Sequence, residues 1–322
     1  MKDFHKSLLS VSVIIISLLC LHLPGFTQKG PLEDFNFPTL GDIEMPEVKE
    51  AQLANGMKIF FVEDHSFPTI SITARLKSGS VFEPADKTGL AAITGQVMRS
   101  GGTTELPGDS LDKILEIMGA SVSTSIGETS ANAYLSCLTE DFETCLPMFA
   151  EVLSSPAFPL KKIDLAKNQH RTAISRRNDD VSQIASREYN KLIYGSDSPW
   201  ARQTEYATIE AITRQDIIDF YDSFFFPDNV IMAVLGDFNW KEMKKKMEEV
   251  FSSWNSAPKT LPPYPSVDYT YTSSVNAIEK PDVNQSTIYL GHLGGTLDNP
   301  DYAALSVMNQ ILSFDRMFKH IR

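Results

Sequence analysis

Apolar residues alternate with polar ones in several short runs of the chain, and they recur every three or four positions in longer ones. Residues 70–76 and 131–138 each place apolar side chains on one face, the period of a half-buried strand. Asn55-Gly56 predicts a hairpin between strands at 51–54 and 57–62. A buried strand is expected at 229–235. Helical periodicity predicts helices at about 89–99, 110–118, 141–153, 160–177, 181–194, 213–224 and 241–254.

Strands and helices are mixed in this pattern without regular strand–helix–strand alternation. This order predicts an α+β fold with a largely antiparallel sheet backed by helices. Four prolines fall within residues 257–265 and interrupt the pattern, so a domain boundary is expected there. The first domain would cover 47–256, the Pro-rich linker 257–265, and the start of a second domain 266–322.

The second segment resembles the first in the order of its residue types. Both have a strand that leads into a Gly turn, then Pro, then a helix, and in the second segment this unit begins at Gln285. The correspondence predicts a duplicated domain whose second copy is incomplete at Arg322. The residues that match at an offset of 216 are Ile72 and Ile288, Ala74 and Leu290, Gly79 and Gly295, and Pro84 and Pro300.

The first 27 residues differ in character from the rest. Lys2 and Lys6 precede an apolar run over 8–23, and small residues follow near Thr27. This pattern predicts a signal peptide over 1–27, an extended arm over 28–46, and a secreted protein of the bacterial periplasm. The alternative is a lipoprotein signal with Cys20 as the lipidated residue, although Leu19 is large for that motif. The run is shorter than a membrane span, and no membrane span is predicted elsewhere.

Charge and cysteine content indicate which partners and which cysteine roles to expect. The chain has 29 Lys and Arg against 41 Asp and Glu, a formal net charge of −12. Binding to phosphate backbones favours a cationic surface, so nucleic acid is not an expected partner. Cys137 and Cys145 fall on apolar faces of a strand and a helix and are expected to be small core residues. Whether they pair in an oxidising compartment stays open.

Residues 89–103 carry the most informative pattern. They read Gly-Leu-Ala-Ala-Ile-Thr-Gly-Gln-Val-Met-Arg-Ser-Gly-Gly-Thr. The segment resembles the zinc-site helix of the pitrilysin/insulinase (inverzincin) metallopeptidases, which include the mitochondrial processing peptidase. Further segments resemble landmarks of that family in the same order, at 115–123, 153–158, 194–195, 211–213, 227–229 and 236–238.

The departures from the family pattern fall on its catalytic residues. In the family, two His at i and i+4 of this helix bind zinc, the Glu at i+3 is the general base, and a Glu further along the chain completes the ligands. Here the resemblance places Ala92, Gly95 and Gln96 at the helix positions and Ala173 at the distal one. It therefore implies no catalytic residue, no metal ligand and no cofactor in this chain, with zinc held only by a partner subunit.

A replacement metal site, catalytic carboxylates or a serine nucleophile are only weakly supported by the sequence. His170 lies one helical turn before Ala173 but has no His or Cys partner at ligand spacing. Asp179-Asp180 stands at a predicted helix end, where capping is expected. Ser121, Ser123 and Ser125 lie on one strand face without the turn that a serine nucleophile needs.

The C-terminal residues hold one further candidate. In family members of this size class, the second domain supplies an Arg and a Tyr that hold substrate backbone, and Phe318–Arg322 resembles the start of that segment. The resemblance makes Arg322 a candidate substrate-binding residue, because a guanidinium is a fixed fork of donors. The alternative is a solvated Arg. Residues 312–318 contain no glycine, so they resemble the bacterial proteins rather than the mitochondrial subunit with its Gly-rich loop.

Together these features favour a secreted, non-catalytic partner subunit of a heteromeric zinc metallopeptidase. Its partners would be a zinc-bearing homologous subunit and a peptide or unfolded protein substrate, held as an added strand along a sheet edge. One alternative is a structural protein that kept the fold, like the core subunits of respiratory complexes. An active peptidase with unusual ligands is a less favoured alternative.

Overall fold

A computed structural model of the chain describes residues 46–255, 259–268 and 272–311. The chain divides into two units, residues 1–45 and 46–322, and every described residue belongs to the second unit. The predicted signal peptide, Cys20 and all but the last residue of the predicted arm fall outside the described residues. Arg322 also lies outside them. Within the described part of the chain, no helix is long and apolar enough to cross a membrane.

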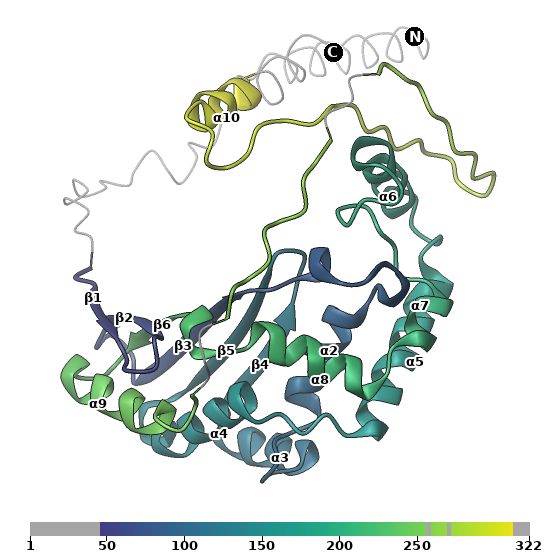
Figure 1. The fold of residues 1–322 in the computed structure, drawn as a ribbon. Coiled ribbons are helices and arrows are strands. Elements are labelled where there is room, and N and C mark those ends of the chain that lie inside the picture. The colour runs from purple at the N-terminus through teal and green to yellow at the C-terminus, as the bar shows by residue number, and fades with distance from the viewer. Residues whose placement is uncertain (1–45, 256–258, 269–271, 312–322) are drawn as a thin grey trace, which may run out of the picture. The chain divides into compact units, whose positions relative to one another are not determined.

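The centre of the described fold is a six-stranded mixed sheet (Figure 1). The strand order is β1-β2-β6-β3-β5-β4, and every neighbouring pair is antiparallel except β2 with β6. The predicted largely antiparallel sheet is therefore confirmed, and β4 and β1 form its two edges. The strands are β1 (Lys49–Gln52), β2 (Lys58–Glu63), β3 (Thr69–Lys77), β4 (Ser121–Ile126), β5 (Ser130–Leu138) and β6 (Val230–Gly236).

Alternation along the strands sets which face of the sheet is buried. In β3, the predicted apolar face is fully enclosed, whereas Thr73 and Arg75 on the other face are exposed. β5 alternates in register with β3, so Ala74 opposes Ala133 and Ile72 opposes Leu135. This cross-strand match builds one continuous apolar layer against the helices.

Helices α2, α3, α4 and α8 lie on the same side of the sheet and cover this apolar layer (Figure 1). Each helix predicted from periodicity is present, and Thr213 caps α8 through a reciprocal bond with Asp216. The helices are α2 (Leu90–Ser100), α3 (Gly108–Met118), α4 (Phe142–Ser154), α5 (Leu160–Arg176), α6 (Val181–Tyr194), α7 (Tyr206–Ala211), α8 (Arg214–Phe224), α9 (Trp240–Phe251) and α10 (Tyr302–Gln310). Short 3₁₀ turns occur at Ser80–Phe82, Ala85–Lys87, Thr139–Asp141 and Pro227–Asn229.

The Pro-rich segment at 257–265, where it is described, contacts the sheet and helices that precede it. The Tyr264 ring stacks on Phe82 at a centroid distance of 5.5 Å, and Lys77 Nζ lies 4.5 Å from the Tyr264 centroid. Trp200 Nε1 donates to the Pro265 carbonyl at 3.2 Å. Aromatic stacking and a cation over a ring each favour this conformation, so the linker follows a fixed path over this surface.

The predicted strand near Gln285 is not formed. Residues 285–291 have no regular secondary structure, and Ile288 and Leu290 are 85% and 97% exposed. A strand is stable only beside another strand, and none lies beside this segment among the described residues. The helix expected after it is present as α10.

Candidate functional site

An open cavity of about 540 Å³ lies where α2 passes the free edge of the sheet. Helix α2 forms one wall, strand β4 the second, and residues from α3 and α5 complete the rim. The lining residues are Ala92, Gln96, Arg99, Ser100, Asp112, Val122, Ser123, Thr124, Ser125, Ile126 and His170.

The structure brings some of the sequence-predicted positions to this cavity. Ala92 and Gln96 line it from α2, and His170 lines it from α5. Gln96 Nε2 donates to Gln169 Oε1, so Gln169 is the α5 residue that faces Gln96. Ala173, the predicted distal position, lies one turn further along α5, is exposed, and is not part of the lining.

Gly95 faces the backbone of β4 rather than open space. A Cβ placed on Gly95 would lie 2.6 Å from the Ile126 amide nitrogen and 2.9 Å from Ile126 Cγ1. The Thr124 hydroxyl donates to the Gly95 carbonyl at 2.6 Å. A backbone atom cannot swing aside as a flexible side chain does, so only glycine allows this approach of helix and strand.

The groups at the cavity do not fit a zinc ion. Zinc sites in proteins use thiolate, imidazole or carboxylate ligands, whereas Ala92 has no donor atom and Gln96 offers a neutral amide. His170 is one imidazole, and Asp112 is engaged by Arg99. Among residues 46–255, 259–268 and 272–311, no three His, Cys, Asp or Glu side chains converge to hold a metal.

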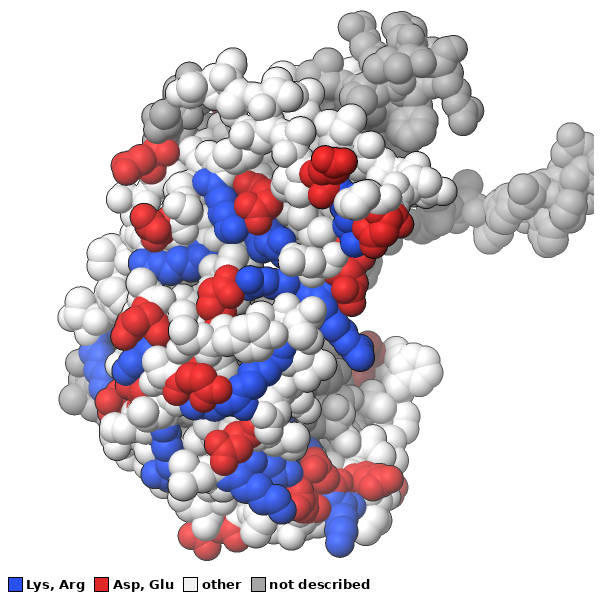
Figure 2. Space-filling model, turned by 90° about the vertical axis from the view of Figure 1, so that its right-hand side faces the viewer, with Lys and Arg blue, Asp and Glu red and all other residues white. Residues whose placement is uncertain are grey.

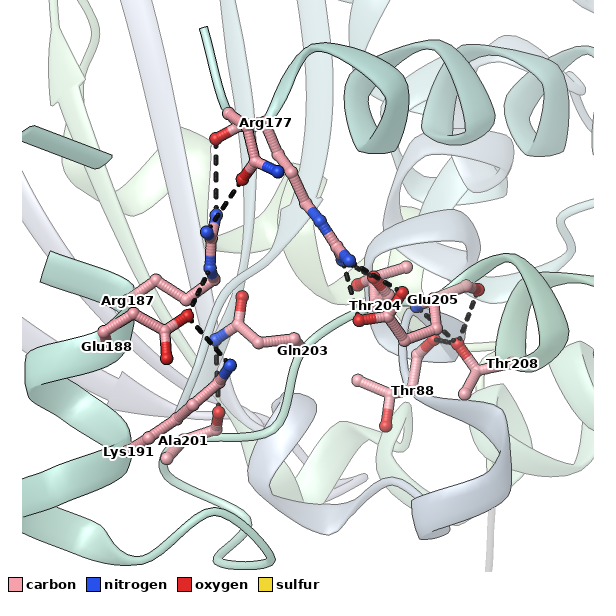
Figure 3. Close-up of polar contacts among 11 residues, drawn as sticks. Thr88, Arg177, Arg187, Glu188, Lys191, Ala201, Gln203, Thr204, Glu205 and Thr208 are labelled. Carbon is pink, nitrogen blue, oxygen red and sulfur yellow. Dashed lines mark hydrogen bonds and ion pairs between the residues drawn. The ribbon is translucent and has the colours of Figure 1, made fainter. Parts of the chain in front are cut away.

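The wall that carries His170 is fixed at the far end of α5. Arg177 forms a two-pronged ion pair with Glu205, at 2.8 and 2.9 Å, and donates to the Thr204 carbonyl (Figure 3). Arg187 of α6 donates to the Arg177 carbonyl at 3.3 Å. These bonds tie α5 to the segment before α7 and to α6. Burial lowers the pKa of His170, which favours a neutral imidazole at the cavity wall.

Strand β4 presents its free backbone edge to the cavity. Gly127 N donates to Ser130 O, which places Gly127 among the residues that bond toward β5. Because bonding alternates along an antiparallel pair, Val122, Thr124 and Ile126 direct their N–H and C=O groups away from β5. The bond from Arg99 Nε to the Val122 carbonyl, at 2.9 Å, agrees with this assignment.

Sequence reasoning missed Arg99. Its Nη2 forms an ion pair with Asp112 Oδ1 at 2.8 Å while its Nε holds the Val122 carbonyl. Arg99 therefore joins α2, α3 and β4 in one place. Arg99 lies one turn after Gln96, and this i, i+3 spacing is the only sequence signal that could have placed it on the cavity face.

Glu83 was also missed, although it holds the start of α2. Its carboxylate is buried and accepts from the Gly89 N–H at 3.0 Å and from the Ala91 N–H. Burial raises the pKa of Glu83 to about 7, and the two backbone bonds and Arg202 oppose that rise. The side chain is thus a remote cap for α2, a role that a residue seven positions before the helix start does not reveal in sequence.

The remaining candidates are structural. Asp180 accepts from the Gln183 N–H and caps α6, as expected for the Asp179-Asp180 pair. Cys137 and Cys145 are free and buried in the core, where burial raises the pKa of Cys137 to about 12. Such thiols are weak nucleophiles. On the face shown in Figure 2, basic and acidic side chains are interspersed rather than separated by sign.

Two family profiles match the sequence in consecutive segments. One, described as Insulinase (Peptidase family M16), matches residues 58–196 and so includes α2, β4 and α5. The other, described as Peptidase M16 inactive domain, matches residues 211–322. Together they span most of the chain.

Similar proteins are longer than this chain. The zinc protease PqqE of Helicobacter pylori is 22% identical over 275 residues, which cover 83% of this chain and 61% of that protein. Cytochrome b-c1 complex subunit 1 of Bos taurus is 19% identical over 275 residues, covering 83% of this chain and 56% of that protein. The chain therefore spans about 60% of the length of these relatives.

Solved structures share the fold. A peptidase M16 inactive domain from Pseudomonas fluorescens superposes with a TM-score of 0.64 at 23% identity, covering 69% of this chain and 54% of that one. The periplasmic protease PqqL of Escherichia coli gives 0.62 at 18% identity, covering 70% and 26%. With the profile matches and the ordered landmarks around α2, these similarities show that the chain belongs to the insulinase (M16) peptidase family and resembles its inactive members.

Proposed function

We propose that this protein is a non-catalytic subunit that binds extended polypeptide and pairs with a zinc-bearing homologue. One observation carries the proposal: the cavity between α2, β4 and α5 is kept, while its groups no longer fit zinc. At Gly95, the strand backbone occupies the space that a general base would need. Hydrolysis by a metal-bound water needs both the metal and a base, and the described residues around this cavity offer neither.

Peptide binding would use the free edge of β4. The edge strand directs the backbone donor and acceptor of Thr124 toward the cavity, where an extended segment can add as a further strand. Ser121, Ser123 and Ser125 are exposed on the open face of the same strand. Small polar side chains there would accept many substrate sequences, because strand addition gains most of its affinity from main-chain bonds.

The similar proteins support, in general terms, pairing with a zinc-bearing homologue and a location in the periplasm. Profiles and structures described as inactive domains match a chain that lies in the same family as zinc proteases. A structural neighbour is described as a periplasmic protease, which agrees with the signal peptide predicted at 1–27. We infer a periplasmic protein, and Arg322 stays a predicted substrate-binding residue because it lies outside the described residues.

The first test is metal content and activity of the purified chain. We expect no stoichiometric zinc and no chelator-sensitive cleavage of an unstructured peptide, since the site lacks ligands and base. The control is His170→Ala, which removes the one imidazole on the cavity wall. About one zinc per chain, lost in His170→Ala, would refute the loss of the site.

The second test is reconstitution. The full chain should be co-expressed with a homologue that has an intact His-x-x-Glu-His, and the mixture sized and assayed on a peptide. We expect co-elution and cleavage that exceeds the sum of the separate chains. A zinc-bearing homologue whose active site is disabled serves as the control for contaminating peptidases.

A scaffold role is the second candidate. It is favoured by similarity to cytochrome b-c1 complex subunit 1, which by its name is one subunit of a larger complex. If the zinc-bearing homologue elutes apart and is fully active alone, the partner-subunit proposal fails and the scaffold role takes its place.

A further inference from the structure

We propose that Arg99 is a stop that limits how far a polypeptide strand can extend along the β4 edge. The inference rests on the proposed function, because it concerns the same cavity and the same extended ligand. It assigns to Arg99 a specificity role: the protein selects the length and register of the bound segment through one side chain.

The geometry places Arg99 on the backbone group that an added strand would need. Val122, Thr124 and Ile126 direct their free backbone groups to the cavity, and Arg99 Nε already holds the Val122 carbonyl at 2.9 Å. A strand that pairs at Thr124 and continues toward the start of β4 meets a guanidinium where its next N–H would donate. It must either end there or displace Arg99.

Asp112 determines how firmly the stop is held. Its carboxylate bonds Arg99 Nη2 at 2.8 Å, and the Arg99 side chain is 16% exposed while that of Asp112 is 56% exposed. A hydrogen bond that involves a charged group is stronger than a neutral one, so displacing Arg99 costs more than an ordinary edge bond returns. The ligand class that fits is therefore a short extended segment whose pairing ends beside Val122.

At the other end of the edge, α2 itself limits access. The Ile126 backbone lies against Gly95, and the Thr124 hydroxyl is bonded to the Gly95 carbonyl. The open stretch of edge thus lies between a permanent contact at Gly95 and a side-chain contact at Arg99. Only the Arg99 contact can be removed by a side-chain substitution without moving the helix.

The test compares peptide binding by the full chain and by Arg99→Met, which keeps the apolar stem and removes the donors. The probes are fluorescent, N-acetylated and C-amidated peptides of alternating Thr and Ser, in a short, a middle and a long form. In the wild-type chain, affinity should stop rising beyond the short form. In Arg99→Met it should continue to rise, and the long form should bind about tenfold tighter than to wild type.

Two further variants keep the test sharp. Asp112→Asn weakens the hold on Arg99 without touching β4 and should give a smaller gain for the long peptide. Asp109→Asn breaks a comparable ion pair of the same helix, with Lys162 at 2.6 Å, and should give none. A long peptide with alternate backbone nitrogens methylated should bind to none of the variants, since it cannot pair as a strand.

The outcomes distinguish the role of Arg99 from peptide binding at the β4 edge. Equal length dependence in wild type and Arg99→Met overturns the stop and leaves strand binding intact. Weaker binding in Arg99→Met also overturns it, because Arg99 would then hold the ligand. Absence of binding in every variant overturns both proposals.

Discussion

Helix α2 has a buried carboxylate at its first turn and no ionisable group at its middle. At the first turn, Glu83 is enclosed in protein, and two backbone N–H groups of the helix start offset part of the cost of burying its charge, although burial still raises its pKa to about 7. At the middle, where the family has a Glu, this chain has Gly95 against the backbone of β4. Burial of a carboxylate is tolerated where donors meet it. Without zinc and its water, a Glu at position 95 would have no such partner.

Gly95→Glu tests this difference between the two positions most strongly. The new side chain would have to displace the Ile126 backbone and would bury a charge, so we expect a loss of about 4 kcal/mol in the free energy of unfolding, measured in urea. Gly127→Glu is the matched control, because Gly127 is exposed and its Cβ would meet only Ser130 O, at 3.7 Å. Similar losses in both variants would show that Gly95 has no special role.

Removal of the Glu83 side chain should have the next largest effect on the free energy of unfolding. Glu83→Ala leaves the Gly89 and Ala91 N–H groups without their acceptor, and we expect a loss of about 3 kcal/mol at pH 5. Chemical denaturation measures it. A loss below about 1 kcal/mol would mean that water replaces the carboxylate and that α2 needs no remote cap.

The charge on Glu83 itself can be tested by pH. Its pKa is raised from 4.5 to about 7 in the folded protein, so between these values the folded chain holds a proton that the unfolded chain has released. Stability from this group is complete below about pH 4.5 and falls as pH rises toward 7, by about 2.5 kcal/mol between pH 5 and pH 8.

Glu83→Gln keeps an acceptor and has no charge, so it should remove this part of the pH dependence. The variant should match wild type near pH 5 and be the more stable protein at pH 8. A wild-type profile that is parallel to that of Glu83→Gln over this range would contradict a buried, titrating Glu83.

The smallest effect is expected at the other degenerate position. Gln96 bonds to Gln169 at the rim of the cavity, where water can replace either amide. Gln96→Ala should change the free energy of unfolding by less than about 0.5 kcal/mol in thermal and urea unfolding. A small effect here beside a large one at Gly95 would show that one family position is free to vary and the other is fixed by packing.

Local patterns predicted the fold well where one face of an element is buried. The alternation in β3 and β5, and the Thr213 cap of α8, follow from residues close in sequence. Helix α7 was not predicted, because it is short and only Ile209 is buried in it. The expected strand near Gln285 needs a neighbouring strand, which a local pattern cannot supply.

The site was predicted in part. Spacing along α2 located Ala92 and Gln96 on one wall, and helix spacing brought His170 to the same cavity. Ala173, the predicted distal position, lies one helical turn beyond Gln169, which is the α5 residue that bonds to Gln96. The contact of Gly95 with Ile126 and the bonds of Arg99 to Val122 and Asp112 join segments that are distant in sequence, so no local pattern contains them. The Glu83 cap spans only a few residues, but it does not follow the usual spacing of a helix cap.

The place of β6 in the sheet has a consequence for synthesis and folding. β6 is the last strand in sequence among the described residues, yet it lies between β2 and β3, and its Ala233 pairs with Phe60 of β2. Until residues 230–236 are in place, the β1–β2 hairpin has no strand that joins it to β3, β5 and β4. Pairing of strands that are distant in sequence slows folding. Before β6 is inserted, the chain therefore carries two separate sheet fragments with open edges. A chaperone that shields these edges would act before β6 is inserted and would have no role afterwards.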